Sequence, residues 1–179
     1  MLIETDIIMA HIKDDAWLKP YAERVLSKAE HGELELYASR ELIHEIYYVA
    51  RNLGIELNKV LEKVVALTRI ENIIWVPTTL DIDLTALTLM VEYNISSIFD
   101  AYHAATALLY DPDRTIISTD RVYDRIPGLH RIDRSSKPYL HLSILYRTVS
   151  DTVWLITALY PLHPAYGSCA PLGEERFIN

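Results

Sequence analysis

Short apolar segments alternate with longer segments of helical periodicity along most of the chain, and this alternation limits the fold more than any other feature. The apolar segments predict strands at residues 2–5, 34–38, 72–76, 115–119 and 130–133. The periodic segments predict helices at residues 16–29, 40–53, 56–70, 80–93 and 98–110. Short buried strands that are separated by helices form parallel sheets covered on both faces. We therefore expect an α/β fold of three layers, in which helices flank a central, mainly parallel sheet.

The composition changes after Arg134, and this change divides the 179-residue chain into two parts. Four of the eight prolines lie in residues 137–179, where acidic residues are sparse. We expect one domain at residues 1–134 and a C-terminal tail at residues 135–179, whose structure the pattern does not define. Within the tail, residues 139–160 are consistent with an apolar helix that covers the domain, with an oligomer contact, or with an appendage that has no evolved role.

Charge and cysteine content narrow the class of protein. The single cysteine, Cys169, excludes a disulfide within the chain and indicates a reducing compartment. The N-terminal residues lack the basic and apolar regions of a signal peptide, and no run of about 18 apolar residues appears, so we expect a cytoplasmic protein without a membrane span. The net charge of −8 argues against a passive nucleic-acid binder, but it does not exclude an enzyme that reaches phosphates through bound cations.

Two acids directly follow predicted strands. Asp6 closes the strand at residues 2–5, and Asp120 closes the strand at residues 115–119. In open α/β sheets, binding sites form beyond the carboxyl ends of the strands, so we expect both side chains to point into one crevice. Each acid also has an ordinary interpretation, since Asp6 could cap a helix and Asp120 could begin a turn.

Two further acids border the apolar faces of predicted helices. Asp100 lies near the start of the helix at residues 98–110, with the small Ala104 and Ala107 on its side. Glu45 borders the apolar stripe of the helix at residues 40–53, which consists of Leu42, Ile46, Val49 and Leu53. A carboxylate against the core is unfavourable unless it is paired or bound to a metal. The ordinary interpretations are a salt bridge at the helix edge for Glu45 and a charge favoured by the helix dipole for Asp100.

Four ionised carboxylates in one crevice would repel one another and raise one another's pKa values. A divalent cation removes this repulsion, and ligands that are all oxygens suit Mg²⁺ or Mn²⁺ better than zinc. Such a cation can activate water and stabilise the charge of a phosphodiester. We therefore predict a metal centre whose ligands and catalytic residues are Asp6, Glu45, Asp100 and Asp120.

The segments that carry these acids are Ile3-Glu-Thr-Asp6-Ile-Ile, Tyr37-Ala-Ser-Arg-Glu-Leu-Ile-His-Glu45-Ile-Tyr-Tyr, Ile98-Phe-Asp100-Ala-Tyr-His-Ala-Ala-Thr-Ala107 and Ile116-Ile-Ser-Thr-Asp120-Arg-Val-Tyr-Asp124-Arg-Ile-Pro-Gly128. In order and spacing they resemble the PIN-domain nucleases, and within them the VapC-type toxins of prokaryotic toxin–antitoxin pairs. The resemblance covers residues 1–133 and implies a PIN fold with RNA cleavage that depends on Mg²⁺ or Mn²⁺. It also implies frequent homodimers and, for the toxins, neutralisation by a small antitoxin. Tyr123 and Asp124 stand where the family commonly has an aromatic residue, often Phe.

Other polar residues near the four acids are weaker candidates. Glu41 and Asp124 could support the site from behind the metal ligands, although Asp124 is also consistent with an ordinary surface acid. Arg121 and Arg125, together with Arg131 and Arg134, form a basic patch that could bind the RNA backbone, and ordinary solvated charges explain the patch equally well. His103 could bind a metal or transfer protons, but a packed or solvated histidine is the more frequent case.

The leading interpretation is an endoribonuclease toxin with an RNA substrate, a small antitoxin partner and a homodimeric state. A PIN-like nuclease for RNA maturation or for DNA is the nearest alternative, because recognition of the 2′-OH is not visible in the sequence. A phosphoryl-transfer protein with an aspartate nucleophile is disfavoured, because Asp6 is followed by Ile-Ile-Met rather than by a second acid. A scaffold without catalysis is disfavoured, because all four acids are retained.

Overall fold

The computed structural model describes residues 1–14 and 16–133 of the chain. The predicted boundary at residue 134, the tail at residues 135–179 and its apolar segment at residues 139–160 lie outside the described residues. Within the described part, no helix is both long enough and apolar enough to cross a membrane.

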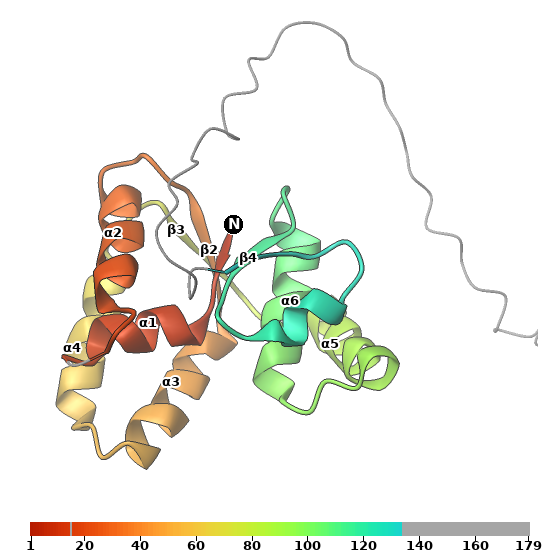
Figure 1. The fold of residues 1–179 in the computed structure, drawn as a ribbon, viewed down its shortest axis with the longest axis horizontal. Coiled ribbons are helices and arrows are strands. Elements are labelled where there is room, and N and C mark those ends of the chain that lie inside the picture. Colours follow the sequence, from red (N-terminus) through yellow and green to blue (C-terminus); the bar gives the residue numbers. More distant parts are fainter. Residues whose placement is uncertain (15, 134–179) are drawn as a thin grey trace, which may run out of the picture. The chain divides into compact units, whose positions relative to one another are not determined.

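Five short strands in the described part of the chain form one parallel sheet (Figure 1). They are β1 (Leu2–Ile3), β2 (Leu36–Ser39), β3 (Ile73–Val76), β4 (Thr115–Ile117) and β5 (His130–Ile132). Their order across the sheet is β3-β2-β1-β4-β5, and every neighbouring pair is parallel. The predicted parallel sheet is therefore confirmed.

Helices cover both faces of this sheet. On one face lie α1 (Thr5–Ile12), α2 (Lys19–Glu30), α3 (Glu41–Asn52) and α4 (Leu57–Leu67), and on the other lie α5 (Leu80–Tyr93) and α6 (Ile98–Tyr110) (Figure 1). Each face has its own cluster of buried apolar side chains. The first includes Ile7, Leu26 and Leu42, and the second includes Ile82 and Ala104. The predicted three-layer arrangement is confirmed.

The two helices of the second face have the bounds that the sequence predicts, because capping residues define their ends. Thr79 Oγ1 accepts a hydrogen bond from Ile82 N at 3.4 Å, and Ser97 Oγ accepts one from Asp100 N at 3.3 Å. Such bonds satisfy backbone donors that the first turn of a helix leaves free. At the far end of α5, Asn94 adopts the left-handed conformation with φ of 51°, which stops the helix.

The prediction for the first strand is wrong in its extent. β1 ends at Ile3, and α1 begins at Thr5, so Asp6 lies in the first turn of a helix rather than at the end of a strand. Glu4, not Asp6, caps this helix, because its carboxylate accepts a hydrogen bond from Asp6 N. α1 is buried along most of its length, including the successive residues 7–10. A helix with so little exposed surface has no clear apolar stripe, which is why periodicity does not detect it.

Three other helix predictions need correction at their ends, and the helix predicted at residues 56–70 ends at Leu67. The sequence predicts Leu53 on the apolar stripe of α3, but Leu53 caps the C-terminus of the helix and is 52% exposed, and Ala50 is buried instead. The helix predicted at residues 16–29 begins at Lys19, with Pro20 in its first turn. Proline is favoured there, because the first turn needs no backbone donor from that residue.

Candidate metal centre

The strand order places the acidic segments in one crevice. The chain adds β2 and then β3 on one side of β1, and afterwards adds β4 and β5 on its other side. The strand order therefore reverses at the point between β1 and β4, although all strands are parallel. Glu4 N donates a hydrogen bond to Ile117 O at 3.3 Å, which joins the two strand ends. In open parallel sheets a crevice forms at such a point, outside the carboxyl ends of the strands.

Glu4 is the most deeply buried acid of this crevice, with 6% of its surface exposed. Its Oε2 accepts hydrogen bonds from Asp6 N and from Ser118 Oγ, each at 3.2 Å. Burial raises the pKa of Glu4 well above its ordinary value, and the carboxylates of Asp6 and Glu45 raise it further. A bound cation would supply the positive charge that stabilises the ionised form.

The two oxygens of Asp6 have different environments. Oδ2 accepts hydrogen bonds from Thr119 N at 2.7 Å and from Thr119 Oγ1 at 2.6 Å, which ties α1 to the loop after β4. Oδ1 is buried and has no hydrogen-bond partner among the described residues. A buried oxygen without a donor is costly, so Asp6 Oδ1 is suited to a cation.

Glu45 reaches the same place from α3, where it meets a histidine. Its Oε2 accepts a hydrogen bond from Thr5 Oγ1 and lies 2.8 Å from His103 Nε2. His103, on α6, is fully buried. Burial alone would raise the pKa of Glu45, but the hydrogen bonds with His103 and Thr5 outweigh it, and the pKa lies below its ordinary value. Glu45 is therefore ionised more readily than Glu4.

Glu4, Glu45 and His103 form a group that could hold a metal ion. Each offers one ligand atom, and these atoms all lie within 4.8 Å of one another. When a cation forms bonds of about 2.1 Å, two ligand atoms on opposite sides of it are about 4 Å apart. The group is thus close to the span of one divalent ion.

Asp100 and Asp120 complete the acidic lining. Burial raises the pKa of Asp100 to about 6, with additional contributions from the charges of Asp120 and Glu45. Asp120 caps a short 3-10 helix, η1 (Arg121–Arg125), through a hydrogen bond of 2.8 Å from Val122 N to its Oδ1. The electrostatic influence of Asp120 and Glu45 on Asp100 indicates that these three predicted acids are neighbours.

Ser118 connects the acids of the two strand ends. Its Oγ accepts a hydrogen bond from Asp120 N at 2.9 Å and lies 3.2 Å from Glu4 Oε2, to which it donates. Ser118 itself is 1% exposed. Ser118 and Thr119 therefore hold Glu4, Asp6 and Asp120 in place from the loop after β4.

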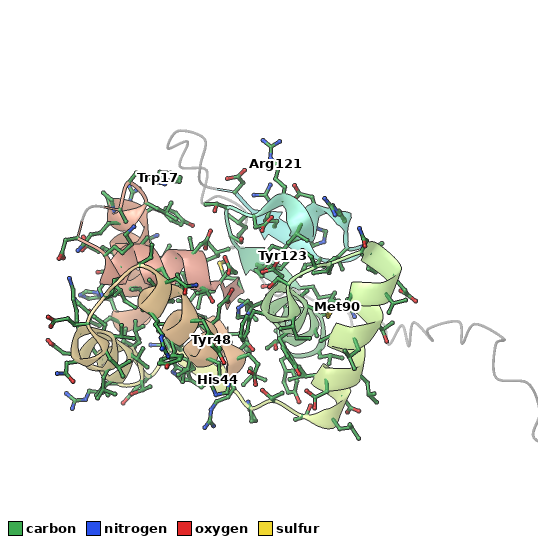
Figure 2. All side chains as sticks on the ribbon, turned by 90° about the horizontal axis from the view of Figure 1, so that it is seen from below. Trp17, His44, Tyr48, Met90, Arg121 and Tyr123 are labelled. Carbon is green, nitrogen blue, oxygen red and sulfur yellow. The ribbon has the colours of Figure 1, made fainter. Side chains whose placement is uncertain are left out.

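Tyr123 places a hydroxyl group beside the carboxylates. Figure 2 shows it inside the molecule between η1 and α6, whereas Arg121 points outward. The side chain is fully buried, and its hydroxyl has no hydrogen-bond partner among the described residues. Burial raises the pKa of Tyr123 well above its ordinary value, and the charges of Glu4 and Asp100 raise it further. Tyr123 therefore offers a neutral hydroxyl that can donate a hydrogen bond within the crevice.

Sequence reasoning identifies four acids here but misses several of their neighbours. Glu4 is overlooked because the first strand is predicted to run through it, although an acid that directly follows Leu2-Ile3 is the available signal. Ser118 and Thr119, two hydroxyl residues directly before Asp120, are a weaker signal. His103 is packed, as the more frequent case predicts, but its ring nitrogen faces Glu45.

The two weaker acid candidates have other partners. Glu41 accepts a hydrogen bond from Thr78 Oγ1 at 2.8 Å and lies 2.7 Å from His44 Nδ1. Asp124 forms two hydrogen bonds with Arg131, of 2.8 Å and 2.9 Å. The pKa values of Glu41 and Asp124 are both lowered; for Asp124 the cause is the Arg131 guanidinium, and for Glu41 the contacts with His44 and Thr78 outweigh burial.

The basic patch divides into two kinds of arginine. Arg121 and Arg125 are exposed on η1, directly after Asp120. Arg131 forms ion pairs with Asp124 and also with Asp133, at 3.1 Å. Arg134 lies outside the described residues, and among the other three arginines of this patch Arg121 and Arg125 are the best placed to meet an external anion.

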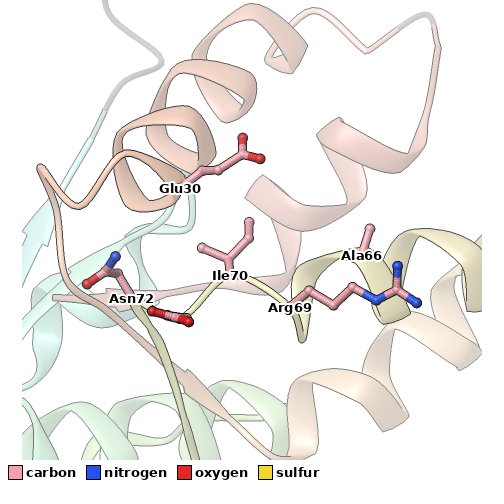
Figure 3. Close-up of a pocket in the computed structure, with 6 residues that line it drawn as sticks. Glu30, Ala66, Arg69, Ile70 and Asn72 are labelled. Carbon is pink, nitrogen blue, oxygen red and sulfur yellow. The ribbon is translucent and has the colours of Figure 1, made fainter.

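A hollow of about 450 Å³ lies elsewhere, and its lining is shown in Figure 3. The lining residues are Glu30, Ala66, Arg69, Ile70, Glu71 and Asn72. Asn72 directly precedes β3, so this hollow is at the amino-terminal edge of the sheet, whereas the acidic crevice is at the carboxyl-terminal edge. The hollow contains charges of both signs on exposed side chains.

Residues 1–129 match the PIN domain family. The chain belongs to this family. The match spans Glu4, Tyr123 and all four acids predicted from the sequence, so the resemblance drawn from the motifs is confirmed. Among curated proteins, no sequence matches the chain.

Three solved structures share the PIN fold. VapC20 of Mycobacterium tuberculosis, described as a toxin that cleaves the sarcin–ricin loop, has a TM-score of 0.52 and 13% identity over 64% of this chain and 85% of its own. A toxin–antitoxin complex from Klebsiella pneumoniae has a TM-score of 0.52 and 20% identity, over 72% and 93% of the two chains. VapBC2 of Rickettsia felis, bound to a DNA fragment from its promoter, has a TM-score of 0.56 and 18% identity, over 74% and 96%. At such low identity these likenesses establish the fold alone.

Proposed function

We propose that this PIN domain is a divalent-metal-dependent endoribonuclease and the toxin of a type II toxin–antitoxin pair. The observation that supports the proposal is the convergence of acids from four separate parts of the chain on the crevice between β1 and β4. These acids are Glu4, Asp6, Glu45, Asp100 and Asp120.

The residues of the crevice fit a divalent cation. Asp6 Oδ1 is buried without a donor, and the pKa values of Glu4 and Asp100 are raised by burial and by nearby acids. Each of these features is unfavourable in the absence of positive charge. Glu4, Glu45, Asp6 through Oδ1, and Asp100 would hold the ion, which we expect to be Mg²⁺ or Mn²⁺. Bound there, the ion would lower the pKa of a water molecule and stabilise charge on the phosphodiester.

The protein's own groups have distinct tasks around that ion. Thr119 and Ser118 fix the orientation of Asp6 and Glu4 through hydrogen bonds. Asp120, whose charge raises the pKa of Asp100, would accept a proton from the attacking water.

The substrate and partners are proposed from the arrangement together with the fold relatives. Arg121 and Arg125 stand exposed beside the crevice and would bind the RNA backbone. VapC20 is described as cleaving the sarcin–ricin loop, an RNA, and the two other relatives are toxin–antitoxin assemblies. We propose by analogy that this chain cleaves RNA in the cytoplasm, forms a homodimer and is neutralised by a small antitoxin.

The test is a cleavage assay with the full chain on RNA and DNA oligonucleotides of the same sequence. We expect RNA to be cut internally in Mg²⁺ or Mn²⁺, DNA to be left intact, and EDTA to abolish the reaction. Full activity in EDTA would contradict the metal mechanism. Equal cleavage of DNA would support a DNA nuclease, and metal binding without cleavage would support a binding scaffold. Co-purification of a small partner protein would test the toxin assignment.

A further inference from the structure

One side chain of the crevice brings chemistry that carboxylates do not have. His103 lies one helical turn after Asp100 on α6 and is fully buried. Its Nε2 lies 2.8 Å from Glu45 Oε2 and 3.2 Å from Thr5 Oγ1. Its Nδ1 has no hydrogen-bond partner among the described residues, so its described polar contacts are those of Nε2 with Glu45 and Thr5.

A histidine–glutamate pair within α3, His44 and Glu41, serves as a comparison because it is a contact at the protein surface. His44 Nδ1 lies 2.7 Å from Glu41 Oε2, a distance almost equal to that between His103 and Glu45. The side chain of His44 is 60% exposed, however, whereas that of His103 is 0% exposed. His44 is a surface partner of one acid, while His103 belongs to a group that also includes the buried Glu4.

We propose that His103 is a nitrogen ligand of the bound cation, together with Glu4 and Glu45, and that it makes the site select Mn²⁺ over Mg²⁺. The proposal rests on the metal dependence put forward above and specifies which ion is used. A nitrogen ligand favours first-row transition ions over Mg²⁺, which takes oxygen ligands and keeps several waters. Among these ions Mn²⁺ gains least from nitrogen, but it also accepts the carboxylates of this site, so it is the transition ion to compare with Mg²⁺. An all-carboxylate crevice would not make this distinction to the same degree.

The distances agree with a shared ion. Two adjacent ligands of an octahedral cation with bonds of about 2.1 Å are about 3 Å apart. The separation of 2.8 Å between His103 Nε2 and Glu45 Oε2 is close to this value. The third ligand atom, from Glu4, also lies within 4.8 Å of both. For a cation to bind among these atoms, His103 Nε2 must give up the proton that it directs at Glu45, and the unpartnered Nδ1 can carry that proton instead.

The competing interpretation is that His103 is a permanent hydrogen-bond partner of Glu45 and never touches the metal. In that case the bound ion would have oxygen ligands only, and replacing His103 would affect the ion only through the orientation of Glu45. The two interpretations differ in whether nitrogen is bonded to the ion, and that difference is directly measurable.

The decisive experiment is pulsed electron paramagnetic resonance of the full chain loaded with Mn²⁺. We expect modulation from a directly bonded ¹⁴N, which changes to the ¹⁵N pattern when the protein is labelled with ¹⁵N-histidine. The signal should be lost in His103→Gln and retained in His44→Gln, the matched control. Bound Mn²⁺ without nitrogen coupling in the unaltered protein would overturn the proposal, and this measurement does not require the His103→Gln variant to fold.

A binding measurement supplies a second readout. The ratio of Mg²⁺ to Mn²⁺ dissociation constants should fall by about tenfold in His103→Gln and stay unchanged in His44→Gln. An unchanged ratio in both variants would overturn the selection of Mn²⁺ by His103. If neither ion binds the unaltered chain and RNA is still cut in EDTA, the proposed metal-dependent function fails as well, so the two failures are distinguishable.

Discussion

The two edges of the central sheet differ in the burial and the sign of their charged side chains. At the carboxyl-terminal edge, Glu4 is almost fully buried and the pKa values of Glu4 and Asp100 are raised by burial and by other acids. At the amino-terminal edge, Glu30, Arg69 and Glu71 line an open hollow, and all three are exposed. The first edge concentrates charge of one sign away from water, and the second leaves charges of both signs in water.

The comparison shows that a hollow and a reactive site are different properties of this fold. The amino-terminal hollow has a volume of about 450 Å³ but contains no buried ionisable side chain in its lining. Exposed charges are well solvated and cost little to keep. Buried acids that lie close to other acids destabilise the chain unless positive charge is bound beside them, so they indicate a ligand. The edge with unfavourable electrostatics is therefore where we expect chemistry.

The largest expected effect follows from neutralising buried acids at the carboxyl-terminal edge. Glu4→Gln and Asp100→Asn should each reduce RNA cleavage by about 100-fold or more, because each removes charge from the metal centre. Neither should lower the melting temperature measured in EDTA, since each also removes repulsion. Cleavage rates and thermal melts of the same samples check this. An inactive variant that is also unfolded would not support a role in catalysis for that acid.

The next comparison uses two acids one turn apart on α3. Glu45 contacts His103 within the ligand group, whereas Glu41 contacts Thr78 and the exposed His44. Glu45→Gln should therefore cost at least about tenfold more cleavage activity than Glu41→Gln in matched assays. The reverse ranking would show that the metal lies nearer the N-terminus of α3, where Glu41 is located.

The sequence is sufficient for the fold where local signals agree with tertiary packing. Thr79 and Ser97 define the starts of α5 and α6, and the bounds of both helices are predicted correctly. α1 is missed because it is buried on most sides, which removes the periodicity that would reveal it. Leu53 is misplaced because helix periodicity continues past the residue at which α3 ends.

The site is predictable only as far as the acids mark it. An acid beside an apolar stripe, such as Glu45, is visible in the sequence because its environment contradicts its charge. The partners that hold those acids are not visible in this way. The contacts of His103 with Glu45, of Thr119 with Asp6 and of Ser118 with Glu4 join residues that are 58, 113 and 114 positions apart in the sequence. Such pairs depend on the sheet order, which the sequence alone does not fix.

Without metal, the stability of the folded protein should depend on pH through the buried Asp100 at the carboxyl-terminal edge. The pKa of Asp100 is raised from 3.8 to about 6, so the folded protein keeps a proton that the unfolded chain has released between these values. This contribution to stability is fully present below pH 3.8 and is lost as the pH rises through about 6. In EDTA the melting temperature should therefore fall more between pH 5 and pH 7 in the unaltered protein than in Asp100→Asn. The two falls should differ by about a few °C. Equal falls in both proteins would show that Asp100 is well solvated.

The smallest effects should come from exposed arginines, and they test whether the two edges differ for an external anion as well. Arg125 is exposed on η1 beside the acidic crevice, and Arg69 is exposed in the amino-terminal hollow. Arg125→Ala should raise the KM for RNA by about fivefold and reduce its dependence on salt, because one phosphate contact is lost. Arg69→Ala, which removes the same charge at the other edge, should leave KM and kcat unchanged. Steady-state kinetics at two salt concentrations measures KM, kcat and the dependence of KM on salt for both variants. Equal effects of both substitutions would mean that RNA binding depends on the net charge of the domain rather than on the arginines of η1.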